Sequence, residues 1–110
     1  MFSFASRGPA LPTPDELRAA VGSAEVVFLD VRTPAEWDEG HVDGAHHLDV
    51  MNPGFDAGLG GLDRSKTYFV YCRSGQRSGQ AATRMQAQGF TARNAGGIGA
   101  LASAGVPVVR

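Results

Sequence analysis

The stretch from Thr67 to Gln88 reads TYFVYCRSGQRSGQAATRMQAQ. It begins with an apolar run of β-forming residues, 67–71, and then passes through a short polar loop. Residues 78–88 have good helical propensity and carry apolar side chains at helical spacing, and Gly89 fits the position just after a helix. The stretch therefore predicts a strand, a loop and a helix in succession, which is the repeating unit of parallel α/β sheets.

Helix and strand signals also alternate before this stretch. Thr13-Pro14-Asp15-Glu16 combines a capping hydroxyl, a proline at the first helical position and a glutamate three residues after the cap, so we expect a helix to about Val21. The apolar run 26–29 is typical of a strand buried on both faces. The same helix-start signal recurs at 33–36, and Gly40 is expected to end that helix.

The remaining segments have weaker signals. We expect a brief strand at 45–48, a flexible glycine-rich connection over 52–61 and a last short strand at 91–94. A Gly96-Gly97 turn, a brief helix at 98–103 and a tail should follow. The alternation as a whole predicts an α/β fold with a mainly parallel sheet.

Composition limits the classes of protein that the chain can belong to. Its 110 residues suffice for a single domain, 1–110. The formal net charge of −1 gives no bulk electrostatic reason to expect nucleic acid or an anionic membrane as a partner. No window approaches the roughly 20 apolar residues of a membrane span, and residues 1–9 lack the basic leader and apolar run of a signal peptide. A single cysteine excludes an internal disulfide and suits a reducing compartment, so we expect a cytoplasmic protein.

That cysteine, Cys72, stands where the predicted strand ends and the loop begins. In parallel α/β sheets ligands bind beyond the carboxyl ends of strands, and a helix N-terminus contributes unpaired N–H groups and partial positive charge. Backbone amides and guanidinium groups favour thiolate over thiol, so we expect a lowered thiol pKa. The alternative to a reactive thiol is that Cys72 is a small, inert side chain buried in the core. The polar loop favours an anion site, and the candidate anion-binding residues are Arg73, Ser74, Gly75, Gln76, Arg77 and Ser78.

Five segments together resemble the rhodanese family of sulfurtransferases. They are 29–37 (LDVRTPAEW), 40–45 (GHVDGA), 72–78 (CRSGQRS), 96–98 (GGI) and 104–107 (AGVP). The resemblance implies a single rhodanese-like domain with its core at about 13–108, in which a small parallel sheet has helices on both faces. It also implies transfer of a sulfane sulfur through a persulfide on Cys72, with no cofactor. The family usually carries a tryptophan near the position of Leu101, and this departure concerns packing.

The loop is similar to the thiosulfate-type pattern because it carries Arg73 and Arg77, and guanidinium groups suit a dianion. We therefore expect a small anionic sulfur donor such as thiosulfate, and cyanide or a thiol as acceptor. The sequence leaves open which arginine dominates anion binding, and Arg77 could instead tie the loop to Asp30 or Glu36. One alternative function is a persulfide carrier or interaction module fed by a partner desulfurase, with 51–61 as its partner-facing loop. A cysteine phosphatase is another alternative function. That family has five residues between its cysteine and its arginine, whereas this chain has four between Cys72 and Arg77.

Other polar residues have structural explanations. Asp30 and Arg32 follow a strand, where a salt bridge or a helix cap explains them better than catalysis does. His41, His46, His47 and Asp43 show no strict ligand spacing, so no metal site is expected. Trp37 is expected to pack, and Gly75, Gly96 and Gly97 to adopt backbone conformations that other residues resist.

Overall fold

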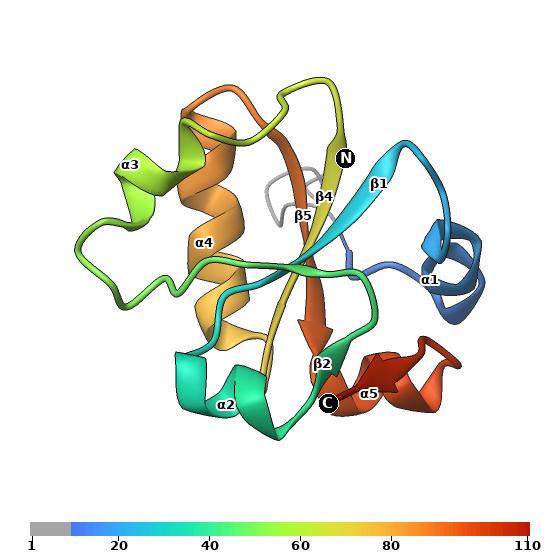
Figure 1. The fold of residues 1–110 in the computed structure, drawn as a ribbon. Helices are drawn as coiled ribbons and strands as arrows, with labels where there is room; N and C mark the ends of the chain where they lie inside the picture. The colour runs from blue at the N-terminus through green and yellow to red at the C-terminus, as the bar shows by residue number, and fades with distance from the viewer. Residues whose placement is uncertain (1–9) are drawn as a thin grey trace, which may run out of the picture.

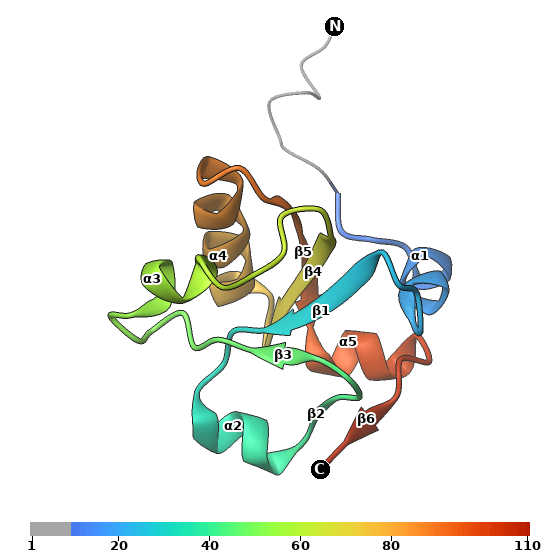
Figure 2. The same cartoon turned by 45° about the horizontal axis from the view of Figure 1, so that its top comes forward.

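Four parallel strands form the centre of the molecule (Figures 1 and 2). The computed structural model describes residues 10–110, and the expectation that the chain starts without an export signal concerns residues outside that range. The strands are β1 (Val26–Asp30), β3 (His46–His47), β4 (Thr67–Cys72) and β5 (Thr91–Gly97). Their order across the sheet is β3-β1-β4-β5, and every neighbouring pair is parallel. The expected α/β class with a mainly parallel sheet is confirmed.

Helices cover both faces of this sheet. In Figure 1, α3 (Phe55–Leu59) and α4 (Gln76–Ala87) lie on one side, and α1 (Pro14–Ala20) and α5 (Ile98–Ser103) on the other. The helix α2 (Pro34–Glu39) lies near the carboxyl ends of β1 and β4.

Two apolar cores result from this arrangement. Alternate residues of a strand point to opposite faces, so Leu29 and Val70 pack with α3 and α4, whereas Phe28 and Phe69 pack with α1 and α5. Leu101 is fully buried in the second core, so its departure from the tryptophan that the resemblance implies concerns packing, as expected.

The two helix-start signals are formed as the sequence predicts. Thr13 and Thr33 each accept a hydrogen bond from the backbone of the residue three positions on, and the glutamate at that position accepts one from the threonine backbone. These capping boxes satisfy N–H groups that a helix start otherwise leaves unpaired. The first helix ends at Ala20 and the second at Glu39, followed by Gly40.

The expectation of a flexible connection over 52–61 is wrong. Helix α3 lies there, and its Phe55 and Leu59 are fully buried on one side of it. The two-residue strands β2 (His41–Val42) and β6 (Val108–Val109) pair antiparallel, and neither is predicted from the sequence. Strand β5 continues to Gly97, so the expected turn at 96–97 is the end of a strand, and α5 follows it directly. Within residues 10–110, no helix combines the length and the apolar character needed to cross a membrane.

Candidate active site

Cys72 is the last residue of β4, the second of the two central strands. Three residues separate it from α4, and the last of them, Gly75, adopts a left-handed conformation with φ of 97°. Glycine tolerates this conformation without steric cost, so it allows the tight passage from strand to helix. The expected anion-binding residues thus form one short loop and the first turn of a 12-residue helix.

Two hydrogen-bond donors lie within reach of the Cys72 sulfur, the Gly75 N–H at 2.9 Å and the Ser78 hydroxyl at 3.3 Å. Burial alone would raise the pKa of the thiol, but the Ser78 hydroxyl and the backbone amides of Ser78, Gly75 and Ser74 outweigh it, so the pKa lies below its ordinary value. Hydrogen-bond donors, rather than the guanidinium groups, account for this lowering. Cys72 itself has no exposed surface, which differs from the usual part-exposed reactive thiol.

The loop lies directly against the end of β5. A Cβ atom added to Gly97 would be 2.4 Å from the Arg73 carbonyl oxygen, and one added to Gly75 would be 3.2 Å from the Gly96 Cα. Gly96 has a φ of 95°, whereas the φ of Gly97 is −95°. Gly97 is therefore required for the space it leaves, and Gly96 for its conformation.

The two arginines of the loop differ in their surroundings. Arg77 donates two hydrogen bonds to Glu36, Nη1 to Oε1 at 2.8 Å and Nη2 to Oε2 at 3.0 Å, and both side chains are part-buried. Arg73 is exposed and makes no ion pair with any residue in 10–110. Of the two partners considered for Arg77, the structure selects Glu36.

Asn94, on β5, is a part of the site that the sequence analysis does not identify. Its Oδ1 accepts from the Ser78 hydroxyl at 2.7 Å and from the Gly96 N–H at 2.9 Å, while its Nδ2 donates to the Gly75 carbonyl at 2.9 Å. The signal that could reveal it is a polar residue near the carboxyl end of the neighbouring strand, because parallel strands end at the same edge.

Asp30 and Arg32 form a buried ion pair beside α2. The Nη2 of Arg32 lies 2.7 Å from Oδ2 of Asp30 and also donates to the Gly40 carbonyl at 2.6 Å. The pair thus joins the end of β1 to the end of α2, which agrees with the expected structural salt bridge. Trp37 stacks with both His41 and His47, whose ring centroids are 3.5 and 4.9 Å away.

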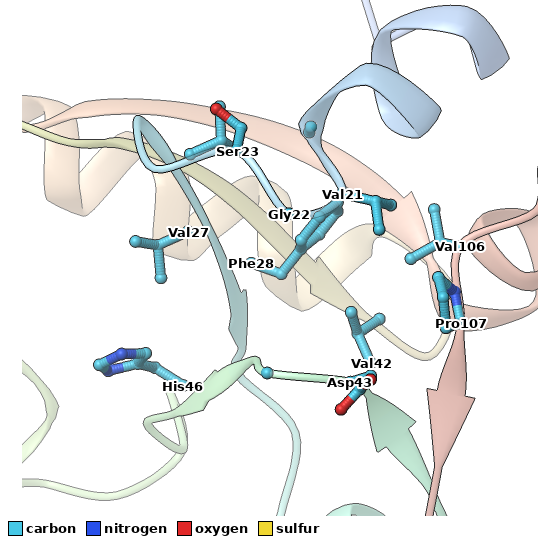
Figure 3. Close-up of a pocket in the computed structure, with 13 residues that line it drawn as sticks. Val21, Gly22, Ser23, Val27, Phe28, Val42, Asp43, His46, Val106 and Pro107 are labelled. Atoms are coloured by element: carbon cyan, nitrogen blue, oxygen red, sulfur yellow. The ribbon is translucent and has the colours of Figure 1, made fainter.

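Two cavities lie on different parts of the surface. One of about 360 Å³ is lined by Arg73, Glu36 and Glu39 together with the apolar residues Ile98, Ala102 and Val108, so it adjoins the loop. Another, of about 380 Å³, is lined by apolar residues of α1, β1 and the segment before β6, with Ser23, Asp43 and His46 (Figure 3). None of residues 72–78 lines this second cavity, and it is therefore not the candidate active site.

The chain belongs to the rhodanese-like domain family, whose pattern it matches over residues 13–104. Solved structures agree. A rhodanese-related protein from Thermoplasma volcanium superposes with a TM-score of 0.78 at 26% identity, covering 90% of this chain and 96% of that one. A rhodanese with anions from Escherichia coli gives a TM-score of 0.63 at 31% identity, covering 77% and 98%.

The family is that of the rhodanese-like sulfurtransferases, and curated relatives carry such names. The chain is 33% identical over 72 residues to the thiosulfate sulfurtransferase PspE of Escherichia coli, covering 64% of this chain and 69% of that protein. It is 37% identical over 90 residues to the probable adenylyltransferase/sulfurtransferase MoeZ of Mycobacterium tuberculosis, covering 79% of this chain. That match spans only 22% of MoeZ, so the chain corresponds to one part of that longer protein.

Proposed function

We propose that this chain transfers a sulfane sulfur from thiosulfate, or a similar donor, through a persulfide on Cys72 to cyanide or a thiol acceptor. The observation that carries the proposal is the pair of hydrogen-bond donors beside the Cys72 sulfur, the Gly75 N–H and the Ser78 hydroxyl. These donors favour the thiolate, which is the nucleophilic form of cysteine.

The proposed reaction has two displacement steps. In the first, the Cys72 thiolate forms a bond to the outer sulfur of thiosulfate, and the sulfur–sulfur bond of the donor breaks with its electron pair leaving on sulfite. In the second, cyanide attacks the terminal sulfur of the persulfide anion, giving thiocyanate and restoring the thiolate. Both steps start and end with an anionic sulfur on Cys72. The same two hydrogen-bond donors, the Gly75 N–H and the Ser78 hydroxyl, can therefore stabilise every charged state of the cycle, and no general base is required.

Arg73 is proposed to bind the donor. Its guanidinium is exposed and borders the cavity next to the loop, whereas both terminal nitrogens of Arg77 are used by Glu36. A free guanidinium suits the sulfonate oxygens of thiosulfate. The pairing with Glu36 also occupies the end of the Arg77 guanidinium and offsets its positive charge, which disfavours binding of a phosphoryl group there and so the phosphatase alternative.

The burial of Cys72 adds a condition to this mechanism. Because the residue has no exposed surface, donor and acceptor reach the sulfur only when the loop residues that cover it are displaced. Arg73 and Ser74 are the exposed residues between Cys72 and the start of α4 and are the ones proposed to move.

A steady-state assay with thiosulfate and cyanide tests the proposal. We expect thiocyanate formation with ping-pong kinetics, lost completely in Cys72→Ser. Substantial turnover by Cys72→Ser would show that another group carries the sulfur.

A persulfide carrier is the second candidate, and one observation supports it. Some of its relatives are longer sulfurtransferases of which the chain matches only a part, 22% of MoeZ and 17% of a tRNA sulfurtransferase from Vibrio vulnificus. In such proteins the rhodanese-like part is joined to other segments. A carrier would be loaded rapidly by a cysteine desulfurase with its cysteine substrate but would turn over poorly with thiosulfate and cyanide, so comparing the two donors separates the candidates.

A further inference from the structure

The hydroxyl of Ser78 has a single proton and two acceptors within reach. Its Oγ lies 2.7 Å from Asn94 Oδ1 and 3.3 Å from the Cys72 sulfur. A hydroxyl donates one hydrogen bond at a time, so the amide oxygen and the sulfur compete for the same proton.

The orientation of the Asn94 amide is determined by two further contacts. The Gly96 N–H needs an acceptor facing it, and an amide oxygen 2.9 Å from the Gly75 carbonyl oxygen would be repelled, so the oxygen of the amide faces Gly96 and the nitrogen faces Gly75. The opposite assignment would place two donors together and two acceptors together. The oxygen of Asn94 is therefore held toward Ser78 whatever the charge on the sulfur.

Charge on the sulfur changes the balance of this competition. A neutral thiol is a weak acceptor, so the hydroxyl gains more from Asn94, at the shorter distance. A thiolate or persulfide anion is a stronger acceptor, because hydrogen bonds to ionised groups are roughly twice as strong as those between neutral groups.

We propose that Asn94 is a positioning residue that holds the Ser78 proton while the Cys72 sulfur is neutral and releases it to the sulfur when the sulfur is charged. Asn94 thereby reduces the net contribution of Ser78 to thiolate stability, because each bond to the sulfur costs the bond to the amide. The assignment of a role to Cys72 rests on the proposed function, but the competition itself concerns only the ionisation of the thiol.

A double-mutant cycle on the thiol pKa tests this inference. The pKa is measured from the pH dependence of alkylation by iodoacetamide in wild type, Ser78→Ala, Asn94→Leu and the double variant. Both variants that carry Asn94→Leu lose the hydrogen bond from Asn94 to the Gly75 carbonyl, so the effect of that loss cancels in the cycle. The charged side chains around the loop are Arg77 with its partner Glu36, Arg73 within the loop, and Asp49, whose charge acts on Arg77. None of them is altered in these variants.

We expect Ser78→Ala to reduce the acid dissociation constant of the thiol by at least about threefold more in the Asn94→Leu background than in wild type, because the competing acceptor is gone. Asn94→Asp provides an opposite arm. A carboxylate holds the hydroxyl more strongly, so in that background Ser78→Ala should have a smaller effect than in wild type. If Asn94→Leu does not fold, the Asn94→Asp background alone shows whether a change at Asn94 alters the effect of Ser78→Ala on the thiol pKa in the expected direction.

Gln86→Leu is the matched control. The side-chain amide of Gln86 also links α4 to β5, because its Nε2 donates a hydrogen bond to the Ala92 carbonyl at 2.7 Å. It should lower stability without changing the effect of Ser78→Ala. Additive effects in the Asn94→Leu cycle, or a larger Ser78 effect in Asn94→Asp, would overturn the inference. Alkylation needs no sulfur donor, so a failure of the proposed sulfur transfer would be seen separately, as an absence of persulfide.

Discussion

Glu36 and Arg77 are 41 positions apart in the chain and form two parallel hydrogen bonds of 2.8 and 3.0 Å. Glu36 lies on α2, after β1, and Arg77 lies in the first turn of α4, immediately after the Cys72 loop. The pair therefore fixes the start of α4, and with it the loop, against a helix that belongs to a different part of the fold. An arginine that resembles a substrate-binding group in the sequence has a structural partner in the folded chain.

Replacing Glu36 by glutamine should remove a pH-dependent part of stability. Hydrogen bonds from Arg77 and from the Thr33 backbone outweigh burial and hold the pKa of Glu36 at about 2, compared with 4.5. A pKa lowered in the folded state gives stability that is present above about pH 4.5 and is lost as the pH falls to about 2. We expect wild type to exceed Glu36→Gln by on the order of 1–2 kcal/mol at pH 6, with the two converging near pH 2. Urea unfolding across this range measures the difference, and parallel pH profiles would contradict the expectation.

Arg73→Gln should impair the use of thiosulfate with little effect on folding. Because the variant loses a charge-assisted hydrogen bond to thiosulfate, we expect the KM for thiosulfate to rise by about tenfold or more. The free energy of unfolding should change by less than about 0.5 kcal/mol. Arg73→Lys should recover part of the loss, since it keeps the charge but not the fork. Arg77→Gln is the matched comparison and should lower stability, because it leaves Glu36 unpaired. An unchanged KM in Arg73→Gln would show that the donor is bound elsewhere.

Gly97→Ala should displace the Cys72 loop. The new Cβ would lie 2.4 Å from the Arg73 carbonyl oxygen, and this neighbour is backbone and cannot turn aside. We expect a loss of about 1–3 kcal/mol in stability and sulfurtransferase activity lowered by about 100-fold or more. Gly61→Ala is the control, because its Cβ would meet nothing closer than the Gly58 carbonyl oxygen at 3.7 Å. Wild-type activity in Gly97→Ala would mean that the loop position is not required.

The rate of persulfide formation should rise with pH through the Cys72 pKa and level off above it, with its midpoint below the ordinary pKa of a thiol. The rate rises because only the thiolate attacks, and the midpoint is lowered because the Ser78 hydroxyl and the loop amides together outweigh burial. Ser78→Ala should move the midpoint of the rise to higher pH, by roughly 0.5 to 1 unit for the loss of one hydrogen bond to the thiolate. Stopped-flow measurements of sulfite release provide the profile. A midpoint that does not move would remove Ser78 from the thiolate-stabilising groups.

Local signals explain which elements can be predicted from the sequence. The starts of α1 and α2 depend on hydrogen bonds between residues three apart, so Thr13 with Glu16 and Thr33 with Glu36 indicate them directly. Helix α3 is different. Its glycines favour a flexible segment, and it forms because Phe55 and Leu59 are buried against the first core, a tertiary effect that local propensity does not contain. The pairing of β2 with β6 joins residues 41 and 109 and has no local signal.

The candidate site shows the same division. The position of Cys72 between a strand and a helix, and the polar loop after it, can be predicted from consecutive residues. From the sequence Glu36 is only one of two possible partners of Arg77, and Asn94 is not identified, because each comes from a separate element that the sheet order and helix packing bring to the loop. The sequence leaves open whether Cys72 is buried, and its full burial results from the packing of the folded chain around it.

The most direct test of the central claim is the intact mass of the reduced protein after brief incubation with thiosulfate, measured beside Cys72→Ser. We predict a gain of one sulfur atom in wild type that cyanide reverses, and no gain in the variant. The absence of any gain in wild type, or an equal gain in Cys72→Ser, would contradict a thiosulfate-loaded persulfide on Cys72.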